Sequence, residues 1–136
     1  MGQCLIQKRF LINNYLIAFG RISPILLGVY CGLIYYLSSQ SSLPIEPLFL
    51  HQDKLIHAAA YAVMGLLAYT LLRHYFRLRY IGFLAWLFCV LYGLSDEWHQ
   101  SFVAGRDADA LDWLADSVGA GLAIYTLNYW SASKAI

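Results

Sequence analysis

A polar segment from Tyr92 to Asp107 holds many of the side chains in this chain that could carry chemistry. Its ionisable and amide residues are Asp96, Glu97, His99, Gln100, Arg106 and Asp107. Carboxylate, imidazole and guanidinium groups can transfer protons, bind metal ions or hold phosphate. Apolar segments flank this one on both sides, and charge at the end of a membrane helix is costly unless it is paired, solvated or used. We therefore expect either a functional site here or a polar network that fixes the fold.

Two further polar groups stand at the starts of apolar segments. The first group is Asp53, Lys54, His57 and Tyr61, and the second is Asp109, Asp112 and Asp116. Helical residues three, four or seven positions apart share one face, so each group is expected to project largely from a single side of a helix. Asp53 is expected to cap its helix and to reach His57 one turn later.

Two interpretations of these groups remain open. Carboxylates at helix N-termini contribute about 0.3–1 kcal/mol each, and polar pairs between membrane helices roughly 0.6–2 kcal/mol, so the set could serve the fold alone. Asp96 and Glu97 stand instead at a helix C-terminus, and Asp116 lies two turns inside an apolar helix. Capping does not explain these three, which favours a site with His57, Glu97 and Asp112 as candidate catalytic residues. The expected ligand-binding residues are Asp53, Lys54, His57, Tyr61, Asp96, Glu97, Gln100, Arg106, Asp109, Asp112 and Asp116.

Metal binding also remains open from the sequence. The side chains of ligand type are His57, Glu97, His99, Asp112 and Asp116. No HExxH or comparable spacing is present, so a metal site would have to be assembled from three helices. We expect no cofactor unless the protein is an enzyme, in which case a divalent cation is required.

The composition indicates an integral membrane protein. Hydrophobic residues make up 60% of the 136 positions and charged residues 12%, whereas soluble domains are about half apolar and a quarter charged. The mean hydropathy of +0.56 agrees. The formal net charge of +1 gives no indication of a nucleic-acid partner.

Four apolar segments are long enough, or nearly so, to cross a bilayer. They cover about residues 22–37, 55–72, 80–94 and 111–129. No alternation with a period of two is present, which favours helices over barrel strands. The sequence thus predicts an all-α, polytopic membrane four-helix bundle over residues 22–130. A cytoplasmic or interfacial segment (1–21), either a separate interfacial helix or an extension of the first membrane helix, would precede it. A short cytoplasmic tail (131–136) would follow. Ser23 and Pro24 suit the start of the first membrane helix.

The charges predict an orientation. Seven of the nine basic residues fall on one side if all four segments cross, namely Lys8, Arg9, Arg21, Arg73, Arg77, Arg79 and Lys134. By the positive-inside rule this side is the cytoplasm, so both termini are expected there. All eight acidic residues fall on the outer side or at the outer helix ends, against Lys54 and Arg106, a formal charge of −6.

The polar residues resemble the motifs of the VanZ-like membrane proteins. They are Asp53-Lys54-x-x-His57-x-x-x-Tyr61, then Asp96-Glu97-x-x-Gln100-x-Phe102-Val103-x-Gly105-Arg106-x-x-Asp109-x-x-Asp112, then Gly119. The match spans roughly half of the chain. Asp116 stands where the family favours Asn, and Ala58 where an aromatic residue is common. The resemblance implies a small multi-pass protein of the bacterial inner membrane, and the founding member is linked to low-level resistance to the glycopeptide teicoplanin.

Two functions follow as hypotheses. In the first, the outer polar cluster binds an envelope component or a membrane protein partner. In the second, the protein is a metal-dependent enzyme acting on a lipid-linked phosphate or a peptidoglycan precursor. There His57 would be the acid or base, and Lys54 and Arg106 would hold phosphate. The formal charge of −6 would repel phosphate without a bound cation, so the enzyme hypothesis requires a metal ion. The lipid bilayer is the remaining expected partner.

Overall fold

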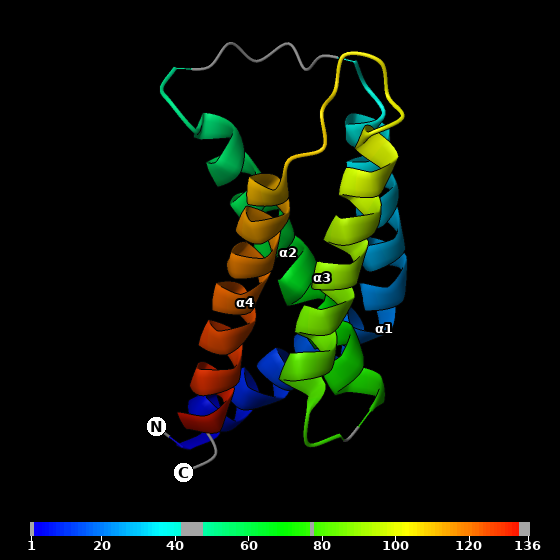
Figure 1. Ribbon diagram of the computed structural model, residues 1–136. Helices are drawn as coiled ribbons and strands as arrows, with labels where there is room; N and C mark the ends of the chain where they lie inside the picture. The colour runs from blue at the N-terminus through cyan, green and yellow to red at the C-terminus, as the bar shows by residue number, and fades with distance from the viewer. Residues whose placement is uncertain (1, 42–47, 77, 134–136) are drawn as a thin grey trace.

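Four helices make up the fold in the computed structural model, which describes residues 2–41, 48–76 and 78–133, with side chains from 19 to 130 within these ranges. They are α1 (Gly2–Ser38), α2 (Gln52–Tyr75), α3 (Ile81–Gln100) and α4 (Ala110–Ser133). No strand occurs within the described ranges. Figure 1 shows the helices running up and down, with the first residues of α1 and the last of α4 at the same end. The predicted all-α four-helix bundle is confirmed.

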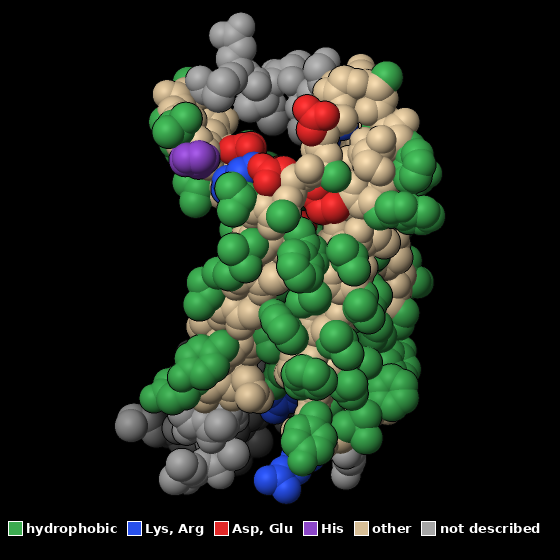
Figure 2. Space-filling view, in the orientation of Figure 1, with side chains coloured by type: hydrophobic (Ala, Val, Ile, Leu, Met, Phe, Trp, Pro, Cys, Tyr) green, Lys and Arg blue, Asp and Glu red, His purple; other side chains and the backbone are tan. Residues whose placement is uncertain are grey.

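Three of the described helices are long and apolar enough to cross a membrane: Phe19–Ser38 of α1, α2 and α3. Their large apolar side chains are widely exposed, and Figure 2 shows them as a broad band across the middle of the face in view. α4 has the same 24-residue length as α2. Its Asp112, Asp116 and Asn128 lower its hydropathy, so a fourth crossing stays a prediction.

Small residues bring α2 and α4 into the most extensive contact between helices. A Cβ atom on Gly119 of α4 would overlap the backbone carbonyl of Ala58 in α2. One on Gly65 would lie 3.1 Å from the carbonyl oxygen of Ala120. Such close approach is typical of small-residue faces between membrane helices.

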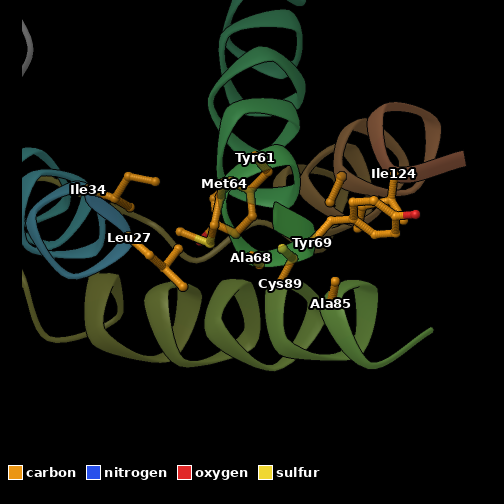
Figure 3. Packing of buried hydrophobic residues seen from close by; sticks show 10 residues of the cluster. Leu27, Ile34, Tyr61, Met64, Ala68, Tyr69, Ala85, Cys89 and Ile124 are labelled. Carbon is orange, nitrogen blue, oxygen red and sulfur yellow. The ribbon is translucent and has the colours of Figure 1, made fainter. Parts of the chain in front are cut away.

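The apolar core lies between all four helices (Figure 3). Met64, Ala85 and Cys89 are fully buried in it. Aromatic side chains also join the helices through hydrogen bonds, as when the Trp86 indole donates to the Ser117 carbonyl at 3.0 Å and the Tyr92 hydroxyl to the Cys31 carbonyl at 2.7 Å. Each such bond contributes about 0.5–1.5 kcal/mol.

The predicted helix start at Ser23–Pro24 is wrong, because α1 continues through Pro24 from Gly2 to Ser38. Proline has no N–H, so the carbonyl of Gly20 loses its usual helical donor. The buried Ser23 hydroxyl donates to that carbonyl at 2.6 Å and replaces the missing bond. The helix therefore persists where the sequence suggested a boundary.

The predicted capping role of Asp53 is also wrong. The N-cap of α2 is His51, which has a left-handed backbone (φ 63°) and no side-chain cap hydrogen bond. Asp53 lies in the first helical turn, where its carboxylate pairs with Lys54 at 2.9 Å.

Candidate functional site

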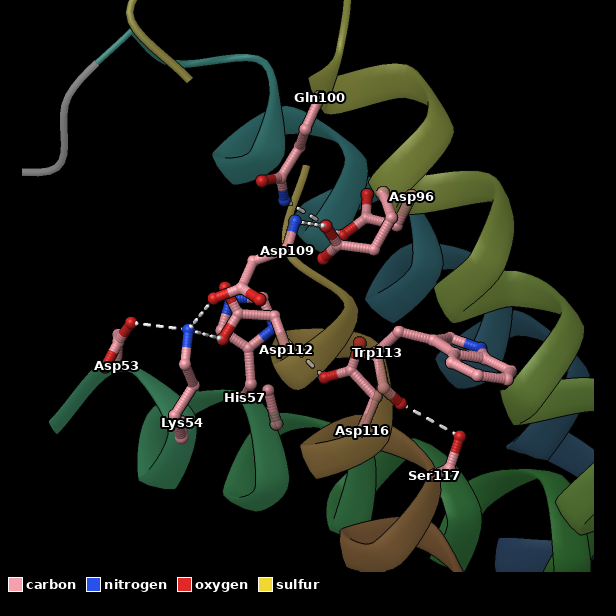
Figure 4. Close-up of polar contacts among 12 residues, drawn as sticks. Asp53, Lys54, His57, Asp96, Gln100, Asp109, Asp112, Trp113, Asp116 and Ser117 are labelled. Carbon is pink, nitrogen blue, oxygen red and sulfur yellow. Dashed lines mark hydrogen bonds and ion pairs between the residues drawn. The ribbon is translucent and has the colours of Figure 1, made fainter. Parts of the chain in front are cut away.

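Acidic side chains gather at the upper end of the bundle, above the apolar band (Figure 2). The first turns of α2 and α4 and the last turn of α3 all lie at this end (Figure 1). The three polar groups of the sequence therefore share one end of the molecule (Figure 4).

Lys54 is held by three carboxylates. Its Nζ lies 2.9 Å from Asp53 and 2.7 Å from Asp112, and it donates to Asp109. Its side chain is only 18% exposed. The hydrogen bond from Lys54 holds the pKa of Asp109 below its usual range. Asp109 also accepts the Leu111 N–H at 2.8 Å, so it caps α4 while it joins α4 to α2.

His57 pairs with the most deeply buried carboxylate. Its Nδ1 lies 3.0 Å from Oδ1 of Asp116, which has no solvent exposure. Its Nε2 lies 4.0 Å from Asp112. Figure 4 shows His57 between the two acids of α4. Gly93 of α3 makes room for this pair, because a Cβ there would lie 3.2 Å from the other Asp116 oxygen and 3.3 Å from the Tyr61 ring.

The adjacent acids of α3 are both buried and held differently. Glu97 Oε2 accepts the backbone N–H of Asp109 at 2.7 Å. Asp96 accepts a 3.4 Å hydrogen bond from Gln100 one turn later. Asp96 and Glu97 are 5% and 6% exposed, although the negative end of the α3 dipole opposes charge at this position.

The structure brings together most of the expected site residues. Direct contacts link one continuous set, which we call the polar cluster: Asp53, Lys54, His57, Glu97, Asp109, Asp112 and Asp116. The buried pair Asp96 and Gln100 lies beside it, and the buried Tyr61 packs against Gly93 next to Asp116.

Two expected residues have their described contacts elsewhere. The Nη2 of Arg106 donates to the Leu37 carbonyl at the end of α1, at 3.5 Å. The His99 ring stacks on Tyr35 at 4.5 Å, and its Nε2 lies 3.0 Å from the Ser39 hydroxyl. Both residues therefore hold α1 in place, and His99 is not in the metal-ligand set that the structure assembles.

An aromatic groove beside the polar cluster was missed in the sequence. It has a volume of about 490 Å³ and lies between α1 and α3. Its lining residues are Tyr35, Tyr92, Ser95, Asp96, Trp98, His99 and Phe102. The spacing of Tyr92, Asp96 and His99 along one face of α3 could have indicated the groove from the sequence. Tyr35 is distant in the chain, and no sequence pattern links it to this face.

Taken together, the helices and their exposed apolar side chains define a small helical membrane protein with a polar cluster at one end. The chain belongs to the VanZ/LLP1 family, whose family model matches residues 22–131. No curated protein and no solved structure matches the chain.

Proposed function

We propose that this protein acts at the bacterial cell envelope by binding an envelope component in the aromatic groove, where Asp96 lies beside the polar cluster. The observation that carries the proposal is this junction of an aromatic groove with a buried carboxylate. The volume of about 490 Å³ lies in the range of small-ligand pockets, about 300–1,000 Å³.

The groove has the chemistry for an amphipathic molecule. Tyr35, Trp98 and Phe102 offer exposed ring faces for an apolar or sugar-like surface. Asp96 and Ser95 can accept hydrogen bonds from hydroxyl or amino groups. A lipid-linked cell-wall precursor combines both kinds of surface, and it is the partner class that we favour.

The charge distribution supports an outward-facing groove. The acidic end would lie outside the inner membrane and both termini in the cytoplasm, as the positive-inside rule predicts for the basic linkers. In this orientation the groove opens at the membrane surface where cell-wall precursors are used. A protein that holds such precursors could lower their access to glycopeptides of the teicoplanin type, as the family resemblance suggests.

Teicoplanin susceptibility of a sensitive host expressing the chain tests the proposal. We expect the wild type to raise the inhibitory concentration, and Trp98→Ala and Asp96→Asn to return it to the value without the protein. Two matched controls should keep the effect. They are Tyr125→Ala, an equally exposed aromatic (69%) outside the groove, and Asp107→Asn in the α3–α4 loop.

Membrane abundance must be recorded for every variant in parallel. If activity falls only in proportion to abundance, or falls equally in the controls, the groove is not the binding site. The residues would then serve the fold alone.

The alternative function is a metal-dependent enzyme acting on a lipid-linked phosphate or peptidoglycan precursor. One observation favours it, the contact of His57 with the buried Asp116, which could orient an acid or base. The phosphate-binding role proposed for Lys54 and Arg106 has less support. Lys54 already contacts three carboxylates, and Arg106 bonds the end of α1. Release of phosphate from a lipid-linked diphosphate by the purified protein would establish this alternative.

A further inference from the structure

We infer that His57, Glu97 and Asp116 form a binding site for one divalent transition-metal ion, with Zn²⁺ and Mn²⁺ as the ions that suit these ligands. The three residues come from α2, α3 and α4, and one ligand atom of each lies within 4.8 Å of the other two. The inference does not depend on the identity of the molecule that occupies the aromatic groove.

The spacing approaches that of a coordinated ion. Bonds from Zn²⁺ to nitrogen or oxygen are about 2.0–2.2 Å, so the ligands of a tetrahedral ion lie about 3.3–3.6 Å from one another. The three ligand atoms lie within 4.8 Å of one another. Binding would therefore draw the three side chains together by roughly 1 Å.

Each of the two carboxylates has one oxygen bound and one oxygen free for a ligand. Glu97 is fixed through Oε2 by the Asp109 N–H, and Asp116 through Oδ1 by His57. The remaining oxygens, Glu97 Oε1 and Asp116 Oδ2, are buried and have no hydrogen-bond partner among the described residues. A buried carboxylate oxygen without a partner is costly, and a cation would satisfy both at once.

The local charge also favours a cation. The two basic residues of this end are engaged elsewhere, Lys54 with Asp53, Asp109 and Asp112, and Arg106 with the Leu37 carbonyl. Among the described residues, His57 is therefore the basic side chain left to balance Glu97 and Asp116, and with both carboxylates ionised the group is negative even when the imidazole is protonated. A divalent ion bound to a neutral imidazole and two carboxylates gives zero net charge.

The ligand types select among ions. Ca²⁺ and Mg²⁺ prefer sites made of oxygen ligands alone, whereas imidazole with carboxylates suits Zn²⁺ and Mn²⁺. The Asp109 N–H that fixes Glu97 is the kind of outer contact that orients metal ligands. Tyr61, almost fully buried and with an unpartnered hydroxyl, packs beside Asp116 and could bond a metal-bound water.

Metal titration of the purified, chelator-treated protein in detergent tests the site. Mn²⁺ binding would be followed by its electron paramagnetic resonance signal, and Zn²⁺ by its displacement of Mn²⁺. We expect one ion per chain, and a rise in unfolding temperature because the ion joins three helices. Glu97→Gln and His57→Gln should weaken binding by about 10–100-fold or more, given the losses seen when even outer-shell contacts are removed.

The control variants distinguish specific binding at these three residues from general attraction of cations to an acidic surface. Asp107→Asn removes one carboxylate from the same end and should leave the affinity unchanged. Loss of the buried carboxylate in Asp116→Asn can prevent folding. Glu97→Gln is therefore the deciding variant, because its amide oxygen can still accept the Asp109 N–H. Absence of binding, or binding equally weakened by Asp107→Asn, would overturn the inference. Neither result would alter the expected effect of Trp98→Ala on teicoplanin susceptibility.

Discussion

Gly119→Ala tests how closely α2 and α4 must approach for the polar cluster to form. A Cβ at this position would overlap the carbonyl carbon and oxygen of Ala58. Backbone atoms cannot rotate out of the way, so the two helices would have to separate by about 1 Å at this turn of a close-packed interface. Asp116 lies one turn before Gly119, and His57 directly precedes Ala58. The separation would therefore also lengthen the 3.0 Å contact between His57 and Asp116.

The expected cost follows from two opposing terms. Overpacking costs about 1–3 kcal/mol, and the upper part of that range applies because the obstacle is backbone. Replacing Gly by Ala inside a helix stabilises the helix by up to about 1 kcal/mol. We expect a net loss of about 1–2 kcal/mol in the free energy of unfolding. Gly28→Ala is the matched control, because a Cβ on Gly28 meets nothing within 4 Å and should be neutral or slightly stabilising.

Unfolding in detergent can be followed through the thiol of Cys89, which is fully buried, after the other two cysteines are replaced by Ser. The labelling rate reports the population of open molecules. If Gly119→Ala labels no faster than the wild type while Gly28→Ala behaves as expected, the close packing of α2 on α4 is refuted.

Two further predictions concern orientation and charge. In a cysteine-free background, an impermeant maleimide should label Leu48→Cys in intact cells but not Arg79→Cys, and the reverse pattern would overturn the proposed orientation. Lys54→Met should lower stability by about 1–3 kcal/mol, a figure reduced by screening because two of its three carboxylate partners are well exposed. Lys54 lowers the pKa of Asp109, so the part of the Lys54 contribution that comes from Asp109 is present at neutral pH and is lost as the pH falls through this lowered pKa. A pH dependence of unfolding unchanged in Lys54→Met would contradict that assignment.

The sequence was sufficient for the fold class and for the polar end of the bundle. Apolar segment lengths gave four helices, and the spacing of acids at the helix ends brought His57, Glu97 and Asp112 to one end. Both follow from local patterns, namely hydrophobic length and helical periodicity. The four crossings, the orientation and the role of the cluster remain predictions.

The wrong or missed predictions concern contacts between residues distant in the chain, or one side chain that replaces a lost backbone hydrogen bond within a helical turn. The prediction of a helix start at Ser23–Pro24 was wrong because the Ser23 hydroxyl replaces the hydrogen bond that Pro24 cannot donate to Gly20. Residue preferences alone do not reveal this compensation. Arg106 was expected to hold phosphate together with Lys54, but its described hydrogen bond is to the carbonyl of Leu37, 69 residues earlier. The groove was missed because Tyr35 comes from α1 and the other rings resembled an interfacial aromatic belt.

The separation of Lys54 and His57 from their partners has a consequence for biogenesis. Asp109 follows Lys54 by 55 residues and Asp116 follows His57 by 59, so α2 leaves the ribosome well before α4 exists. During that interval its cationic and imidazole groups, and the small residues that receive Gly119, have no partner from α4. α4, which is not among the described helices apolar enough to cross a membrane, then arrives last and meets a surface of complementary charge and shape on α2. Insertion of α4 would thus be completed by recognition of α2 rather than by its own partitioning into lipid.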